Sequence, residues 1–135
     1  MKVNMFTQDE IKKMMNDIEI ENAQIDKMDI EVLGEFGNAV CLYLPIMFKG
    51  NMVAFPFNCI SSTLSIGCII RAIFEVLDIR EGNGIKLSEI KKYPCRIAMN
   101  NGGVVAIGNF IDDKFIIIED LFKQFKEYIN NLEIK

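Results

Sequence analysis

The chain has 135 residues, 50% of them hydrophobic and 25% charged, with no histidine and a formal net charge of −4. This length and balance predict one folded domain over residues 1–135, and the acidic charge argues against a broad basic face for duplex nucleic acid. The absence of histidine excludes Ser-His-Asp and Cys-His nucleophile systems and His-containing zinc sites.

A helix is predicted at the start of the chain. Thr7 and Glu10 have the spacing of a capping box, and Phe6 and Ile11 hold the positions of a hydrophobic staple. Apolar residues then recur at helical spacing in a narrow stripe. We therefore expect residues 1–18 to form a helix that is peripheral to the domain.

A strand pattern follows the first helix. From Glu19 the spacing of apolar residues changes to two, which is typical of a half-exposed strand. Pro56 confines the last of these strands to an edge or to its own end. The three predicted strands cover residues 28–32, 39–44 and 52–57. Together they predict an antiparallel meander.

The segment 63–77 predicts a helix that is apolar on nearly all sides. Such a helix is either buried in the domain or shared with another subunit. Because it offers more apolar surface than a small domain can cover, we expect a homo-oligomer.

The last third of the chain predicts a second group of strands and a final helix. Asn100–Gly103 has the composition of a hairpin turn, and Ser88 has the character of a residue that starts one helical turn. The predicted strands cover 95–99, 104–110 and 115–118, and the helix covers 119–132. The whole order predicts an α+β fold, with an antiparallel β-meander and a second β-hairpin group around one buried central helix, and with N- and C-terminal helices.

The cysteines indicate a cytoplasmic protein. None of the four has the CxxC spacing of a zinc or redox motif, and all lie in apolar runs, so we expect buried, reduced thiols. They are Cys41, Cys59, Cys68 and Cys95. The apolar stretch 64–77 is too short and too charged to span a membrane. The abundance of Ile, Asn and Lys indicates a bacterium or its phage, and hence the cytoplasm of a bacterial host.

Arginine is rare in this chain, and two arginines lie in apolar elements. Arg71 lies inside the most apolar helix and Arg96 inside an apolar strand. The planar guanidinium holds phosphate or carboxylate with two hydrogen bonds, so either residue could bind an anionic ligand. The alternatives are that Arg71 pairs with Glu75 one turn on, and that Arg96 faces solvent. Both interpretations stay open.

Aromatic and amide residues provide further candidates. Phe57 followed by Asn58 predicts a stacking ring beside an amide that reads a base edge, and Asn109 and Phe115 belong to similar pairs. Core packing is the alternative for each. The adjacent carboxylates of residues 112–113 favour a turn over a metal or acid–base site. We expect no catalytic set, metal or cofactor.

Two segments near the C-terminus resemble a known family. They read Cys-Arg-Ile over 95–97 and Val-Ala-Ile-Gly-Asn-Phe-Ile-Asp-Asp-Lys-Phe over 105–115. They are similar to the C-terminal part of small phage proteins known as Thoeris anti-defence sponges, and the similar region covers about residues 19–122. The matching positions are Arg71, Arg96 and Asp112 or Asp113. The segment 54–59 departs from that family, which has a Gly-rich aromatic segment ending in Asp there.

This resemblance implies a non-enzymatic phage protein that sequesters a cyclic ADP-ribose signal of a bacterial immune enzyme without cleaving it. We expect such a ligand to lie between subunits. The expected ligand-binding residues are Arg71, Arg96, Phe57, Asn58, Asn109, Asp112, Asp113 and Phe115. The alternative is a protein–protein inhibitor of a defence effector, in which the acidic segment 26–35 mimics nucleic acid.

Overall fold

The computed structural model describes residues 2–33, 35, 39–54, 59–60, 63–79 and 86–134. The elements are α1 (Gln8–Met14), β1 (Ile18–Ile25), β2 (Asp29–Leu33), β3 (Ala39–Tyr43), β4 (Pro45–Phe48), β5 (Asn51–Ala54), β6 (Cys59–Ile60), α2 (Thr63–Leu77), the 3-10 turn η1 (Leu87–Ile90), β7 (Tyr93–Asn100), β8 (Gly103–Gly108), β9 (Phe115–Ile117) and α3 (Ile118–Ile134). The fold is α+β, as the sequence predicts.

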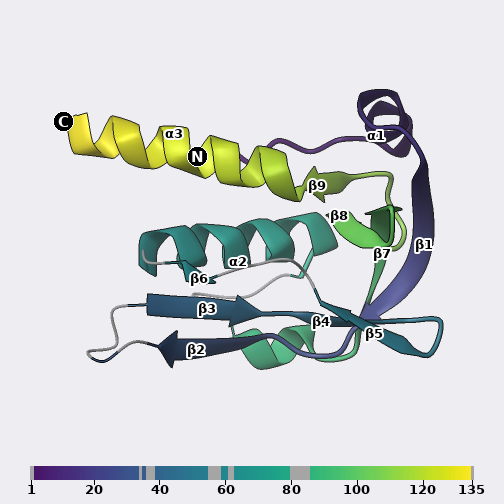
Figure 1. The fold of residues 1–135 in the computed structure, drawn as a ribbon, viewed down its shortest axis with the longest axis horizontal. Helices are drawn as coiled ribbons and strands as arrows, with labels where there is room; N and C mark the ends of the chain where they lie inside the picture. The colour runs from purple at the N-terminus through teal and green to yellow at the C-terminus, as the bar shows by residue number, and fades with distance from the viewer. Residues whose placement is uncertain are drawn as a thin grey trace.

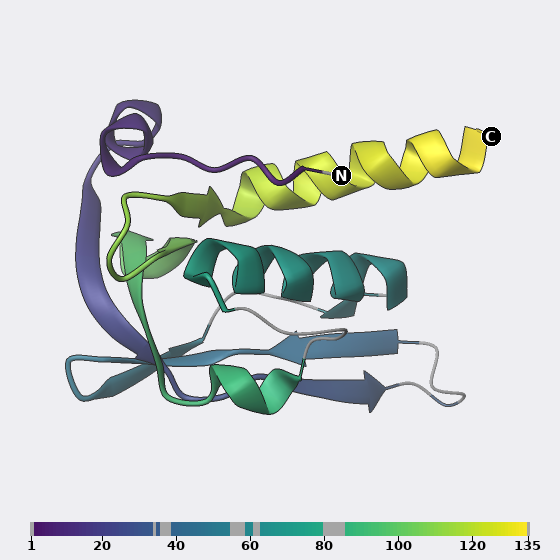
Figure 2. The same ribbon diagram turned by 180° about the vertical axis from the view of Figure 1, so that it is seen from behind.

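The strands form two antiparallel sheets. One has the order β5-β4-β1-β7-β8-β9, and the other has the order β2-β3-β6. Helix α2 lies between α3 on one side and β3 on the other, and it also contacts β6, β8 and β9 (Figures 1 and 2). The expected buried central helix is therefore present, but the larger sheet is built both from strands that precede it in the chain and from strands that follow it.

The predicted meander is wrong in its third strand. β2 and β3 pair as expected, but β5 pairs with β4 in the other sheet, and β6 is the second neighbour of β3. The reason is the turn between β4 and β5, where Lys49 and Gly50 have φ values of 49° and 77°. Two positive φ values are typical of a tight hairpin, which pairs β5 with the strand immediately before it.

The first helix begins where the sequence predicts and ends earlier. Thr7 and Glu10 form the complete capping box, and Phe6 packs against the same small cluster as the fully buried Ile11. The helix ends at Met14, because Met15 already has an extended backbone, and Asp17, with a φ of 56°, then turns the chain into β1. β1 then pairs with β7 over eight residue pairs.

The structure removes the physical reason for expecting an oligomer through α2. Ile69, Ala72 and Ile73 are fully buried, and Phe74 and Leu77 are 2% exposed, all within one chain. The apolar sides of α2 are covered by α3 and by strands of both sheets, so a second subunit is not needed to cover them.

The second group of strands largely follows the sequence. Asn101 and Gly102 have φ values of 52° and 82° in the turn between β7 and β8, and α3 follows β9 directly. The predicted role of Ser88 is wrong: η1 has Lys86 as its N-cap residue, with no side-chain capping bond. Lys86 precedes the turn in an extended conformation, and its side chain has no oxygen that could accept from the free N–H groups of the turn.

The cysteines differ from the expectation. Cys41 is disulfide-bonded, and the strand register places Cys59 directly opposite it. Cys68 and Cys95 are free thiols. The expectation of four reduced thiols is therefore wrong for Cys41, since two antiparallel strands bring it opposite another cysteine. None of the helices in the described part of the chain is long and apolar enough to cross a membrane.

Candidate functional site

Two of the candidate residues, Arg96 and Phe115, lie at paired positions on three neighbouring strands. Gly108 on β8 lies opposite Arg96 on β7 and opposite Phe115 on β9. Because Gly108 has no side chain, the ring of Phe115 lies over it, and a Cβ there would be 2.3 Å from that ring. The Arg96 guanidinium then reaches the ring, 4.9 Å from its centre. Arg96 is therefore stacked on a buried aromatic ring.

The Arg96 guanidinium also binds the loop between β8 and β9. Its Nε donates to the carbonyl oxygen of Asn109 at 2.8 Å, and its Nη2 donates to that of Asp112 at 2.8 Å. Arg96 is half-buried, so the expectation that it simply faces solvent is wrong. Two of its donors are engaged within the chain, which leaves fewer for an anionic ligand.

Asn109 joins the same loop to the end of α2. Its Oδ1 accepts from the backbone N–H of Ile111 and Asp112 at 2.8 and 2.9 Å. Its Nδ2 donates to the carbonyl of Val76 at 3.0 Å and to Oδ2 of Asp78 at 3.1 Å. Asn109 is 6% exposed, and both donors and both acceptor positions of its amide are used.

Two charged residues, Lys114 and Asp113, connect this loop to other parts of the chain. Lys114 Nζ lies 2.6 Å from Asp78 Oδ1, and Asp113 Oδ1 accepts from the backbone N–H of Gln8 at the start of α1. The structure thus brings Arg96, Asn109, Asp112 and Phe115 together, and Asp113 turns to α1. Phe110 and Ile111 remain 45% and 86% exposed. The loop is held from several directions and presents two apolar side chains to solvent.

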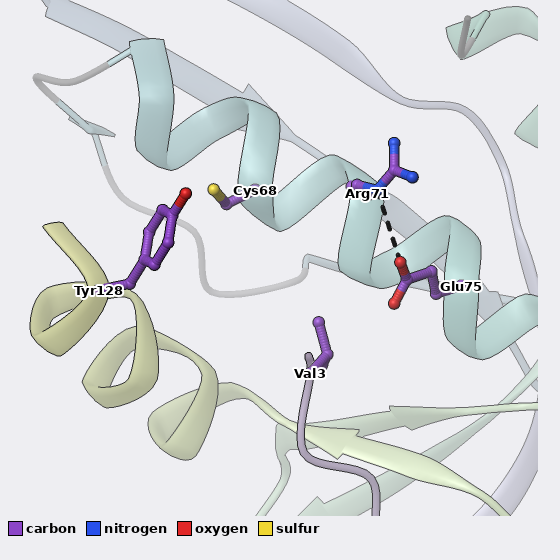
Figure 3. Close-up of a pocket in the computed structure, with 5 residues that line it drawn as sticks. All are labelled: Val3, Cys68, Arg71, Glu75 and Tyr128. Atoms are coloured by element: carbon purple, nitrogen blue, oxygen red, sulfur yellow. Dashed lines mark ion pairs between the residues drawn. The ribbon is translucent and has the colours of Figure 1, made fainter. Parts of the chain in front are cut away.

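Arg71 lies at a different place, on the face of α2 that borders α3. Its Nε is 3.5 Å from Glu75 Oε1, so the predicted pair one turn apart is confirmed. The Arg71 side chain is 72% exposed, and this ion pair is the only polar contact found for it among the described residues. It lines a hollow of about 170 Å³ together with Val3, Cys68, Glu75 and Tyr128 (Figure 3).

The N-terminal segment forms one wall of this hollow. The side chain of Gln124 on α3 binds the backbone on both sides of Val3: its Nε2 donates to the carbonyl of Lys2, and its Oε1 accepts from Asn4 N at 3.1 Å. Val3 is 8% exposed, and the segment runs along α3 (Figure 2). The hollow is therefore built from three segments that are far apart in the sequence.

Sequence reasoning missed Val3, Tyr128 and Gln124. Cys68 is one helical turn before Arg71, a spacing that could have placed both on one face of α2. No local signal places residues of the N-terminal segment and α3 beside α2. The predicted residues Phe57 and Asn58 lie outside the described residues.

The chemistry available in the described part of the chain is limited. It contains no group of three or more Cys, Asp or Glu side chains that could hold a metal ion. Burial raises the pKa of the Cys95 thiol to about 12. At neutral pH its thiolate fraction is therefore roughly a thousandth of that of an ordinary cysteine, which makes it a poor nucleophile.

No protein-family model, curated protein or solved structure matches this chain. The resemblance to the Thoeris anti-defence sponges stays a prediction. The geometry offers two places for a partner, the hollow beside Arg71 and the loop that follows β8. At the first, the arginine is exposed; at the second, the polar groups largely bind one another.

Proposed function

We propose that this chain is a non-catalytic protein that binds and sequesters a small anionic nucleotide of the cyclic ADP-ribose type. The observation that carries the proposal is a hollow that the largely exposed Arg71 lines from α2 and the ring of Tyr128 lines from α3 (Figure 3). A guanidinium holds phosphate with charge-assisted hydrogen bonds, and an aromatic ring stacks on a nucleobase.

The size of the hollow indicates how such a ligand lies. An apolar cavity of about 150 Å³ holds benzene, so the 170 Å³ hollow accommodates one ring system. Pockets that enclose whole ligands are larger, about 300–1,000 Å³. The proposed base therefore enters the hollow while the phosphates stay outside it at Arg71. A second copy that closes over the exposed part would explain tight retention, and association would then depend on the ligand.

The proposal places the chain in the cytoplasm of a bacterial host, as a phage-encoded anti-defence protein. The Cys41 disulfide would be exposed there to reduction by cellular thiols. Sequestration needs binding without turnover, so the proposal assigns no general acid or base.

Binding of cyclic ADP-ribose, measured by calorimetry on the full chain, tests the proposal. We expect Arg71→Ala to weaken binding about 10- to 100-fold, since one or two charge-assisted hydrogen bonds are lost. Tyr128→Leu removes the stacking ring and should weaken binding about 3- to 10-fold. Lys123→Ala, an exposed lysine of α3 that does not line the hollow, is the matched control and should bind normally.

Alkylation gives a second readout of the same site. Cys68 lies in the hollow, so bound cyclic ADP-ribose should slow its reaction with iodoacetamide, whereas buried Cys95 should stay unreacted with or without ligand. Equal affinity of wild type and Arg71→Ala, or no protection of Cys68, would overturn the assignment of the ligand to this hollow.

A second candidate function, inhibition of a defence effector by direct protein contact, is favoured by the exposed tip of the loop after β8. Phe110 and Ile111 are presented on a loop that many hydrogen bonds hold in place, and such pre-organisation lowers the entropic cost of binding. In cells with a nucleotide-signalling defence system, Phe110→Ser with Ile111→Ser should then abolish inhibition and leave cyclic ADP-ribose binding intact. Arg71→Ala should abolish inhibition instead if the chain acts as a sponge.

A further inference from the structure

β2 is the outermost strand of the smaller sheet. The strand order is β2-β3-β6, so one edge of β2 has no strand partner within the described residues. The backbone N–H and C=O groups along such an edge can pair with another strand. β2 is five residues long, which is enough for a ladder of several hydrogen bonds.

The apolar residues of this edge strand are exposed. Ile30 is 40% exposed and Val32 is 66% exposed. In the register of the sheet they lie opposite Leu42 and Val40, and paired residues share one face. Leu42 is 2% exposed and belongs to the main core, with Val40 packed against it. Ile30 and Val32 therefore extend the core-facing side of the sheet beyond the part that the chain itself covers.

We propose that β2 pairs antiparallel with β2 of a second copy of this chain, centred on Glu31. The two small sheets then form one continuous sheet across a two-fold axis. In this register Ile30 lies opposite Val32 of the second copy, and Val32 lies opposite its Ile30. These two apolar pairs cover the exposed side chains. The backbone N–H and C=O groups along the open edge of each copy form hydrogen bonds with the other copy.

Charge favours this register over the one centred on Ile30. Centring the pair on Ile30 would place Asp29 opposite Glu31 twice, whereas centring it on Glu31 brings only the two Glu31 side chains together. Like charges directly opposite each other destabilise a strand pair. Asp29 is also compensated within its own chain, since Lys27 Nζ lies 3.2 Å from its Oδ2. The hydrogen bond and charge of Asp29 raise the pKa of Lys27 above its ordinary value.

The open edge of β5, at one end of the larger sheet, is less suited to pairing with a second copy and provides a control. β5 ends the larger sheet with four residues, of which Met52 is an exposed large hydrophobic at 51%. In Figure 1, β2 lies across the molecule from α3, so the proposed pairing does not depend on the hollow beside Arg71. The inference therefore stands apart from the proposed function and is tested without ligand.

Sedimentation velocity of the full chain, from about 5 to 500 μM without ligand, tests the pairing. We expect a reversible monomer–dimer equilibrium, because a five-residue strand pair buries less area than a standard interface. Val32→Lys should give a monomer at every concentration, since it places a cation at each apolar pair. Glu31→Gln removes the one like-charge contact and should tighten the dimer about 3-fold. Met52→Lys should leave the equilibrium unchanged.

Three results would overturn the inference. The first is a wild-type monomer at 500 μM, and the second is a Val32→Lys variant that dimerises as the wild type does. The third is loss of the dimer in Met52→Lys, which would assign the contact to β5. Circular dichroism shows whether the Val32→Lys variant is folded. Val32→Thr is a milder change that should weaken the dimer without abolishing it.

Discussion

Replacing Gly108 with alanine is expected to lower the free energy of unfolding by about 3 kcal/mol, the upper end of the range for overpacked interiors. The added Cβ would lie 2.3 Å from Cδ2 and 2.4 Å from Cε2 of Phe115, so the ring must move. Phe115 is fully buried and supports the Arg96 guanidinium, which leaves the ring no free space on either side. In thermal denaturation this corresponds to a fall of roughly 10 °C in Tm.

The same strand contains a matched control. Gly103 begins β8, and a Cβ there meets only the carbonyl oxygen of Asn100 at 3.6 Å, an ordinary contact. Gly103→Ala should therefore change stability by less than about 1 kcal/mol. Phe115→Leu should partly relieve the clash, so Gly108→Ala should cost less in that background than in the wild type. Equal costs in both backgrounds would show that the ring does not rest on Gly108.

The sequence predicted the elements whose signals are local. The capping box of Thr7 and Glu10, the apolar run of α2 and the Asn101-Gly102 turn each act within a few residues, and each appears where expected. No strand was predicted over residues 18–25, where β1 lies, and the partner of β1 could not be predicted in this way either. β1 pairs with β7, about seventy residues further along the chain, and no local pattern specifies such a pairing.

The candidate residues illustrate the same difference. The family resemblance pointed to Arg71, Arg96 and Asp112 or Asp113. The structure brings Arg96 and Asp112 together, whereas Arg71 lies at a different place on α2. The Arg96 guanidinium donates to two carbonyl oxygens of the loop after β8, because the strand register places it beside that loop. Residue types alone do not predict this contact. Tyr128 and Val3 come from opposite ends of the chain, so their convergence with Arg71 follows only from the packing of α3 on α2.

Replacing Asn109 with alanine is expected to destabilise the protein by about 4 kcal/mol, since four hydrogen bonds of about 1 kcal/mol each are lost. The change frees the N–H groups of Ile111 and Asp112 and the carbonyl of Val76. Urea denaturation measures the loss, and hydrogen exchange should become faster first in the loop after β8. Asn22→Ala is the control, because Asn22 is exposed and its side chain has no hydrogen bond to the described residues.

Asn109→Asp separates the donor half of this amide from its acceptor half. The substitution keeps an oxygen for the two loop N–H groups, but it replaces the NH₂ group that faces the Val76 carbonyl and the Asp78 carboxylate at 3.0 and 3.1 Å. Burial and the charge of Asp78 raise the pKa of the new carboxyl in the folded state above its unfolded value. Stability is then retained at low pH, where the carboxyl is protonated and can donate, and is lost as pH rises through the folded pKa. The deficit relative to wild type should therefore widen between about pH 4 and pH 8. A deficit that stays constant across this range would mean that the amide does not face Asp78, and the link between the loop and α2 would have to be rebuilt from Lys114 alone.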